Sequence, residues 1–258
     1  MKEKNFFNYN FIIPVFLLIF LFSCSDKESN DSSRNDGGSE TGKGGSMARF
    51  AIKGDRLYIV DNEYLNMFDI TEVSNPNFIL KKHIGFNIET IFPKDTLLFI
   101  GSQNGMHIFD ISNPDNPKQL STYRHIQSCD PVVADDNFAY VTLQTTRSSW
   151  CGPRYVNELQ VIDIKNLYNP KFVKSRNMVG PQGMSLDGNE LFVCDDFLKV
   201  FDISYPSNNL EIKYEINVQG NDLILNDNIM MILGDDGFSQ YAYENGEITF
   251  LSKIKIEK

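Results

Sequence analysis

"MHIFDISNPDNP", residues 106–117, joins a strand-like apolar run to a turn that contains two prolines. The same strand and turn recur more loosely at residues 65–76 ("LNMFDITEVSNP"), 159–170 ("LQVIDIKNLYNP") and 198–209 ("LKVFDISYPSNN"). A chain that repeats one short unit in this way indicates a repeat fold, in which neighbouring copies stack and bury a shared core.

A second apolar strand precedes each copy and sets the period of the repeat. Equivalent residues in these strands are Leu57, Leu98, Ala139, Leu191 and Met230, which lie 41, 41, 52 and 39 residues apart. The long step contains an extra segment, residues 145–158. Repeats of about 40–45 residues with four strand-like runs each are typical of propeller blades. The sequence therefore predicts an all-β fold, a β-propeller of five four-stranded blades.

The predicted blades span residues 47–86, 87–127, 128–179, 180–217 and 218–258, approximately. The first unit starts with its innermost strand and the last unit ends with its outermost strand. No strand is left over to complete a shared blade, so we expect the ring to close by packing of the last blade on the first.

Aspartates end the third strand of four units, at Asp69, Asp110, Asp163 and Asp202. A carboxylate at this position can accept hydrogen bonds from backbone N–H groups of the following turn. The prolines of the same turns fix φ and limit extra strand pairing. We interpret the repeated motif as structural rather than catalytic.

The first 23 residues have the pattern of a signal peptide. Lys2 and Lys4 give a basic start, and residues 11–22 form an apolar run that is too short to cross a bilayer as a helix. The run ends in "LFSC", residues 21–24, which resembles the lipobox of bacterial lipoproteins. That resemblance implies cleavage before Cys24 and attachment of a diacylglycerol to its sulfur.

Residues 24–46 are predicted to be the lipidated cysteine and a flexible tether. The stretch from Ser25 to Ser46 contains no large apolar side chain, so it cannot bury enough surface to offset its ordering entropy. "CSDKES", residues 24–29, also resembles the acidic stretch of surface-exported lipoproteins of Bacteroidetes-type bacteria. We expect a lipid-anchored protein of the outer membrane, with the outer surface favoured over the periplasm.

The chain carries a formal net charge of −10. Binding of nucleic acid depends on neutralising phosphates with Lys and Arg, so this composition argues against a nucleic-acid partner.

Three stretches resemble LVIVD repeats: "LYIVDNEYLNMFDI", "LLFIGSQNGMHIFDI" and "LFVCDDFLKVFDI", which begin at residues 57, 97 and 191. This family occurs in secreted and lipid-anchored bacterial proteins and is expected to form β-propellers. The resemblance covers essentially residues 47–258 and implies a fold and an envelope location. It implies no settled biochemical activity.

One insertion carries a candidate binding surface. Residues 145–158 hold the single tryptophan of the chain, Trp150, together with Arg147 and Arg154. A tryptophan flanked by arginines on an exposed loop suits contact with a glycan or a protein. The same loop could instead pack over the channel, with Trp150 as its plug.

Cysteine positions suggest how that insertion is held. Cys129 begins the first strand of the third unit and Cys151 lies in the insertion, on the same predicted face. The envelope is oxidising enough for a disulfide between them, which would fix the insertion across the channel mouth. Cys194 lies within an apolar strand and is expected to be a buried free thiol.

Polar residues recur at one register of the innermost strands. Nine places before the aligned second-strand residues stand Ala48, Glu89, Asp130, Gln182 and Asn221. These side chains could line a hydrated polar channel mouth. Glu89 and Asp130 could also coordinate Ca²⁺, or act as the acid and base of a glycoside hydrolase.

The remaining polar signals are weaker. The acid pairs Asp135–Asp136, Asp195–Asp196 and Asp235–Asp236 fall at predicted turns, where aspartate is common. We therefore predict a non-catalytic binding or scaffolding module for a protein or glycan, without a required cofactor. The alternative is an extracellular carbohydrate hydrolase that uses the channel-mouth carboxylates.

Overall fold

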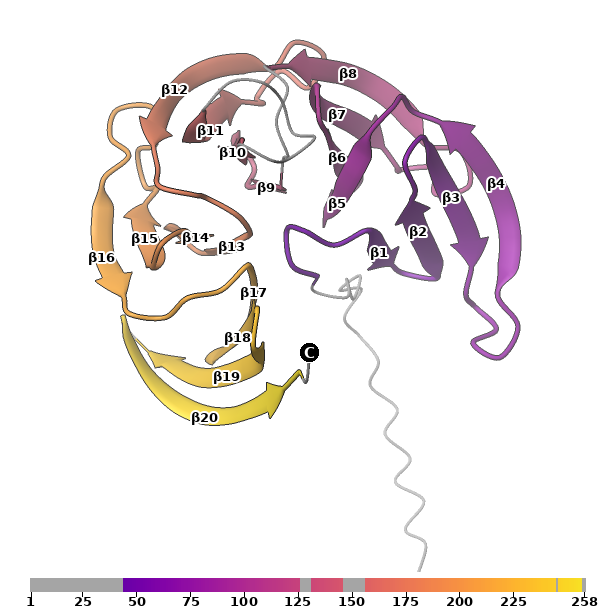
Figure 1. The fold of residues 1–258 in the computed structure, drawn as a ribbon. Coiled ribbons are helices and arrows are strands. Elements are labelled where there is room, and N and C mark those ends of the chain that lie inside the picture. The colour runs from indigo at the N-terminus through magenta and orange to yellow at the C-terminus, as the bar shows by residue number, and fades with distance from the viewer. Residues whose placement is uncertain (1–43, 126–130, 146–155, 245, 257–258) are drawn as a thin grey trace, which may run out of the picture. The chain divides into compact units, whose positions relative to one another are not determined.

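The computed structural model describes residues 44–125, 131–145, 156–244 and 246–256. All of these residues belong to one unit of the chain, residues 39–258. Those residues form strands and turns, without a helix (Figure 1). A helix able to span a membrane is therefore not present in the described part of the chain.

Twenty strands form five four-stranded antiparallel sheets. The first sheet contains β1 (Phe50–Lys53), β2 (Arg56–Val60), β3 (Tyr64–Asp69) and β4 (Asn77–His83). The second contains β5 (Ile88–Lys94), β6 (Leu97–Ser102), β7 (Gly105–Asp110) and β8 (Lys118–Arg124). The third contains β9 (Val132–Ala134), β10 (Phe138–Gln144), β11 (Asn157–Asp163) and β12 (Lys171–Asn177). The fourth contains β13 (Met184–Asp187), β14 (Glu190–Cys194), β15 (Leu198–Asp202) and β16 (Ile212–Ile216). The fifth contains β17 (Asp222–Asn226), β18 (Ile229–Gly234), β19 (Gly237–Glu244) and β20 (Glu247–Lys255).

Strand order within every sheet follows the chain, with each strand paired to the next. The first strand of each sheet lies near the centre of the arrangement and the fourth lies at its outer edge (Figure 1). Consecutive antiparallel hairpins need only short turns, which is why one repeat of about 41 residues suffices for a sheet. The fold is an all-β five-bladed β-propeller, as the sequence predicted.

The repeated aspartates accept the turn hydrogen bonds that the sequence predicted. In the first, second, third and fourth sheets, the carboxylate accepts from the backbone N–H two residues later, at distances of 2.8, 2.8, 2.9 and 2.9 Å. These bonds lower the pKa of Asp110 and Asp202, because they favour the ionised carboxylate. The motif therefore fixes the turn between the third and fourth strands.

The same turns also join neighbouring sheets. Side chains of an outermost strand donate to backbone carbonyl oxygens in the turn of the next sheet: Lys82 to Pro117 at 2.6 Å, Ser121 to Leu167 at 2.6 Å, Lys174 to Asn208 at 2.9 Å, and Arg176 to Leu210 at 2.9 Å. The repeated motif thus supplies both a tight turn and an acceptor for the preceding sheet.

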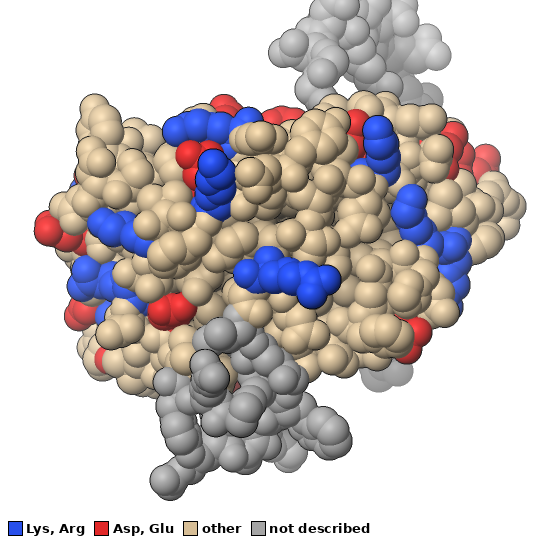
Figure 2. Space-filling model, turned by 90° about the horizontal axis from the view of Figure 1, so that it is seen from above, with Lys and Arg blue, Asp and Glu red and all other residues tan. Residues whose placement is uncertain are grey.

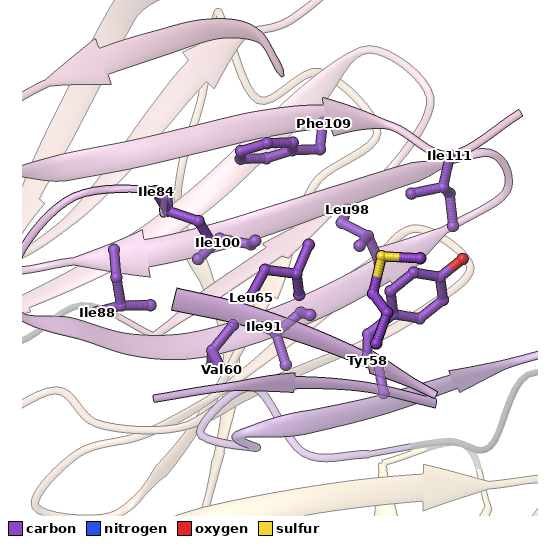
Figure 3. Packing of buried hydrophobic residues seen from close by; sticks show 12 residues of the cluster. Tyr58, Val60, Leu65, Ile84, Ile88, Ile91, Leu98, Ile100, Phe109 and Ile111 are labelled. Carbon is purple, nitrogen blue, oxygen red and sulfur yellow. The ribbon is translucent and has the colours of Figure 1, made fainter. Parts of the chain in front are cut away.

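Four junctions between consecutive sheets are sealed by hydrophobic clusters. Between the first and second sheets, Tyr58, Leu65 and Met67 pack against residues such as Leu98 and Phe109 (Figure 3). All five of these side chains are fully buried. Equivalent clusters lie between the second and third, third and fourth, and fourth and fifth sheets.

The junction between the fifth and first sheets differs from these four, and we call it the open junction. Among the described residues no hydrophobic cluster joins the two sheets, which Figure 1 shows standing apart. Phe50 of the first sheet is 57% exposed, and Leu233 and Ile254 of the fifth are 46% and 67% exposed. The expected packing of the last blade on the first is therefore not found in the described part of the chain.

A short hub segment, residues 44–48, links the two terminal sheets instead. The Ser46 hydroxyl and the Met47 backbone N–H donate to the Asp222 carboxylate of β17, at 3.4 and 3.3 Å. The Met184 backbone N–H donates to the Ser46 hydroxyl at 2.6 Å, and the Ile91 backbone N–H donates to the Ala48 carbonyl oxygen at 2.9 Å. Polar contacts near the centre thus hold the N-terminal strand in place.

The outer edge of the propeller is basic although the chain as a whole is acidic. Strands β4, β8 and β12 contain seven Lys or Arg residues and no Asp or Glu. Figure 2 shows one outer side, on which Lys and Arg stand spaced among mostly uncharged residues, with several Asp and Glu beside them. Charged side chains on an exposed edge strand prevent pairing with the edge of another molecule, so this pattern protects the sheets from aggregation.

Candidate functional site

Most of the binding residues that the sequence predicted lie outside the described residues. These are the lipidation site Cys24, the predicted disulfide partners Cys129 and Cys151, the carboxylate Asp130, and the insertion residues Arg147, Trp150 and Arg154. The predicted disulfide, lipid anchor and tryptophan surface remain predictions.

Of the four polar residues predicted at the channel mouth, three are described, and two of these come together. Gln182 and Asn221 line a single cleft between the fourth and fifth sheets. Glu89 lies in β5, outside that lining, where its carboxylate accepts a hydrogen bond from Gln103 at 3.0 Å. Among the described residues, the hollow that contains two of the predicted residues is therefore this cleft, and the predicted ring of polar residues stays a prediction.

This cleft, which we call the acidic cleft, has a volume of about 700 Å³. Its rim carries two pairs of neighbouring carboxylates, Asp195–Asp196 in the β14–β15 loop and Asp235–Asp236 in the β18–β19 loop. The link between β16 and β17, residues 217–221, forms a third side. These loops join second to third and fourth to first strands, which is the face on which the sequence placed the ligand site.

Asp195 is the structural carboxylate of the cleft. Its side chain is fully buried and accepts hydrogen bonds from the backbone N–H groups of Val179 and Gly180, at 3.1 and 2.5 Å. Lys199 donates to the same carboxylate at 2.8 Å. These three donors compensate its burial, so Asp195 fixes the loop rather than facing a ligand.

The other carboxylates of the cleft are nearer to solvent. Asp196 pairs with Lys199 and Asp236 pairs with Lys253, and these hydrogen bonds hold the pKa of both carboxyls below its usual value. Asp235 accepts a hydrogen bond from the Asn221 amide at 2.7 Å. Four carboxylates and two ammonium groups leave the cleft with a net negative charge.

Aromatic surface completes the lining. Phe197 is 38% exposed at the rim, and the partly buried Tyr241 contributes a second ring. A site with carboxylates, amides and an accessible ring offers hydrogen bonds and apolar stacking together, as glycan and peptide sites do.

The Asp222 carboxylate beside the cleft is largely buried, and this burial raises its pKa to about 6. Glycine is required around it, because a Cβ on Gly45 or Gly183 would lie 2.0 or 2.1 Å from a carboxylate oxygen of Asp222. Since Asp222 binds the hub segment, its titration bears on how the first sheet is held.

No metal site is found in the described residues, which contain no group of three or more His, Cys, Asp or Glu side chains placed to hold an ion. Cys194 is a buried free thiol, as the sequence predicted, and burial raises its pKa. It therefore shows no sign of the thiolate character that a reactive cysteine needs.

From the sequence, the three acid pairs are predicted only to be turn residues. Asp195–Asp196 and Asp235–Asp236 both follow a second strand, so both lie on the ligand face. Asp135–Asp136 follows a first strand, and Asp136 instead pairs with Lys94 at 2.7 Å. The sequence signal that distinguishes the cleft pairs from Asp135–Asp136 is therefore the strand that each pair follows, a second strand or a first strand.

The comparisons with known proteins support the fold. Residues 44–82 and 96–124 match the model of the LVIVD repeat, and these segments hold most of the first two sheets. These two segments are therefore similar to LVIVD repeats, and they lie within the five-bladed β-propeller. No curated protein sequence matches the chain.

Several solved propellers have a similar fold at low sequence identity. The periplasmic gluconolactonase PpgL of Pseudomonas aeruginosa matches with a TM-score of 0.58 and 13% identity, over 79% of this chain and 68% of that one. A functionally unknown protein from Desulfotomaculum acetoxidans matches with a TM-score of 0.58 and 13% identity, over 76% and 68%. BamB from Moraxella catarrhalis matches with a TM-score of 0.52 and 10% identity, over 72% and 55%. At these identities the likeness establishes the fold alone.

Proposed function

We propose that this protein is a non-catalytic binding module of the bacterial cell envelope that holds a glycan or a protein segment in the acidic cleft. The observation that carries the proposal is the cleft itself, where exposed carboxylates, the Asn221 amide and the Phe197 ring line one hollow. Its net negative charge favours a ligand that is neutral or positively charged and rich in hydrogen-bond donors.

The lipid anchor belongs to the same proposal. Cleavage before Cys24 and lipidation of its sulfur would tether the propeller to the outer membrane through residues 25–46. Mass spectrometry of the mature protein tests this directly, since a diacylated N-terminal Cys24 is expected. A Cys24→Ser chain should leave the membrane fraction, whereas retention there by the variant would contradict the anchor.

Binding is tested with fluorescently labelled protein on an array of bacterial oligosaccharides and short peptides. Replacing Phe197 and Asn221 by alanine should weaken the strongest signals at least 10-fold, since stacking and an amide hydrogen bond are both lost. Asn228→Ala is the matched control, because Asn228 is an exposed asparagine that lines a separate hollow with β14 and β19 residues. Equal signals from the double variant and the wild-type protein would contradict the proposal.

The enzyme alternative is tested in the same preparation. Glu89→Gln and Asp130→Asn remove the two carboxylates that the sequence offered as acid and base. We expect binding to the array to be unchanged and no product to be released from the bound oligosaccharide. Turnover that disappears in these variants would replace the binding role by a hydrolytic one.

A further inference from the structure

We propose that a hollow between the first and second sheets binds a small molecule that carries an anionic oxygen group, a carboxylate or a phosphate. The hollow has a volume of about 330 Å³, which is within the range of small-molecule sites. Its walls are the turns that join β1 to β2, β5 to β6 and β7 to β8. We call it the Tyr58 hollow, and its lining includes Lys53, Arg56, Tyr58, Thr96 and Ile111.

The Tyr58 hollow lies on the opposite face of the propeller from the acidic cleft. The cleft is formed by loops that join second to third and fourth to first strands, whereas the turns of the hollow join first to second and third to fourth strands. Consecutive strands of a sheet are antiparallel, so these two sets of connections emerge at opposite ends of the strands. The site is therefore independent of the proposed function.

The observation that points to a ligand is the Tyr58 hydroxyl. The side chain is fully buried, and its hydroxyl has no hydrogen-bond partner among the described residues. Figure 3 shows the hydroxyl oxygen directed out of the hydrophobic cluster, on the side where Ile111 lies. Burial raises the pKa of Tyr58 to about 12, so the hydroxyl keeps its proton and acts as a donor. A buried donor without an acceptor costs free energy, and its presence needs an explanation.

The equivalent tyrosine of the third sheet shows what the first sheet lacks. Tyr140 occupies the same repeat position as Tyr58 and is also fully buried. Its hydroxyl donates to the Asp135 carboxylate at 2.9 Å. The third sheet thus supplies, from the turn between its first two strands, the acceptor that a buried hydroxyl at this position requires.

The first sheet has a lysine at the position of that carboxylate. Lys53 stands five residues before Tyr58, as Asp135 stands five residues before Tyr140. Strand register is the same in both sheets, because the residue before Lys53 or Asp135 pairs with the residue before the tyrosine. Lys53 has no hydrogen bond or ion pair within the described part of the chain. Two donors therefore line one hollow, where the third sheet has a donor and an acceptor.

The other charged groups of the hollow are paired or exposed. Arg56 donates to the Asp115 carboxylate at 2.7 Å, and Asp95 pairs with Lys94. The Asp55 side chain is exposed to solvent, which screens its charge. None of these carboxylates reaches the Tyr58 hydroxyl, whose only possible acceptor is thus one that enters from outside.

An anionic oxygen group would satisfy both donors at once. It would accept a hydrogen bond from the Tyr58 hydroxyl, as Asp135 does from Tyr140, and it would pair with the Lys53 ammonium group. Hydrogen bonds to an ionised acceptor are roughly twice as strong as those between neutral groups. Ile111, also in the lining, offers an apolar contact for the rest of the molecule.

The experiment uses benzoate and phenyl phosphate as probes and benzamide as the neutral control. Binding to the full chain is measured by titration with saturation-transfer NMR. We expect saturable binding of at least one anion. Benzamide should bind at least 10-fold more weakly, because an NH₂ group replaces one carboxylate oxygen and cannot accept from either donor. The anion that binds more tightly shows whether the site prefers a carboxylate or a phosphate.

Three variants distinguish a built site from general attraction of charge. Tyr58→Phe keeps the ring and should weaken anion binding about 10-fold, because one hydrogen bond to a charged group is lost. Lys53→Asp places in the first sheet the acceptor that the third sheet has, so it should abolish binding. Lys171→Asp is the matched control, at an exposed lysine of β12, and should bind as the wild type does.

The contrary results are equally defined. Absence of saturable binding of both anions would overturn the proposal, and so would benzamide binding as tightly as benzoate. Equal affinity of the wild-type and Tyr58→Phe chains would mean that the hydroxyl does not contact the ligand. An equal loss in Lys171→Asp and Lys53→Asp would reduce the signal to general charge attraction, and this result would also overturn the site.

Discussion

The junction between the first and second sheets and the open junction are built from the same repeat, yet they differ in what covers them. At the first, Leu98 and Phe109 are buried against Tyr58, Leu65 and Met67. At the second, equivalent apolar faces remain partly exposed, and within the described part of the chain hydrogen bonds between Asp222 and the hub segment connect the fifth sheet to the segment that precedes the first. A repeat therefore fixes each sheet, whereas the covering of its faces depends on which neighbour is present.

The contrast is sharpest for one pair of equivalent leucines. Leu98→Ala should lower the free energy of unfolding by about 2–5 kcal/mol, because it leaves a cavity in a sealed junction. Leu57→Ala should cost less than about 1 kcal/mol, because its side chain is only partly buried and its surroundings can relax. Urea denaturation followed by circular dichroism measures both. Equal losses would show that the two junctions are packed alike.

The polar contact at the open junction makes stability depend on pH. The pKa of Asp222 is raised to about 6 by burial, so the folded chain binds this proton more tightly than the unfolded chain does. Its contribution is therefore complete below the unfolded value of 3.8 and is lost as pH rises through about 6.

Comparison with Asp222→Asn isolates this effect, because all other carboxylates are common to both chains. Between pH 4 and pH 7 the wild type should lose roughly 2 kcal/mol relative to the variant, since one pKa unit corresponds to about 1.4 kcal/mol. Parallel stability curves for the two chains would contradict a buried Asp222.

Removal of a buried hydroxyl at the junction between the first and second sheets should have a smaller effect, and it should stabilise the protein. The Tyr58 hydroxyl is buried without a hydrogen-bond partner among the described residues. Tyr58→Phe should raise the free energy of unfolding by about 1 kcal/mol, because it removes an unsatisfied polar group and keeps the ring. Thermal unfolding checks this. A lower midpoint in the variant would show that the hydroxyl is hydrogen-bonded.

The smallest effect concerns the contact between outermost strands and turns. Lys82→Met should cost about 0.5–1 kcal/mol, since it removes one hydrogen bond to Pro117 but keeps the apolar stem. Ile254→Lys introduces the same group at the open junction and should change stability by less than about 0.5 kcal/mol, because Ile254 is 67% exposed. A gain in the second variant comparable with the loss in the first would show that the junction closes.

The period of the repeat and the burial of each strand explain why the fold was predictable. Leu57, Leu98 and their equivalents mark the second strand of every sheet, and the motif aspartates mark the end of the third. Both signals are local, and strand pairing within a blade is local as well. Packing of the last sheet on the first would instead depend on residues from the two ends of the propeller sequence. A local sequence pattern therefore cannot predict whether it forms.

The sequence predicted which face of the propeller carries the candidate site, but it did not predict between which two sheets the site lies. Gln182 and Asn221 were found because they share a register of the innermost strands, and both line the acidic cleft. The carboxylates of Asp196 and Asp236 were missed, because aspartate is common in turns whether or not a ligand binds there. Whether these carboxylates can contact a ligand depends on whether a cleft lies beside their loops, and the packing of the fourth and fifth sheets decides that.

The central claim, that one junction is open while four are sealed, is tested most directly by the reactivity of introduced thiols. Leu57→Cys and Leu98→Cys chains are treated with maleimide in the native state, and labels are counted by intact mass against the wild type. We predict one additional label on Leu57→Cys within minutes and none on Leu98→Cys until the chain is unfolded. Equal protection of both cysteines would contradict the account, because it would mean that the first sheet is covered in the same way as the second.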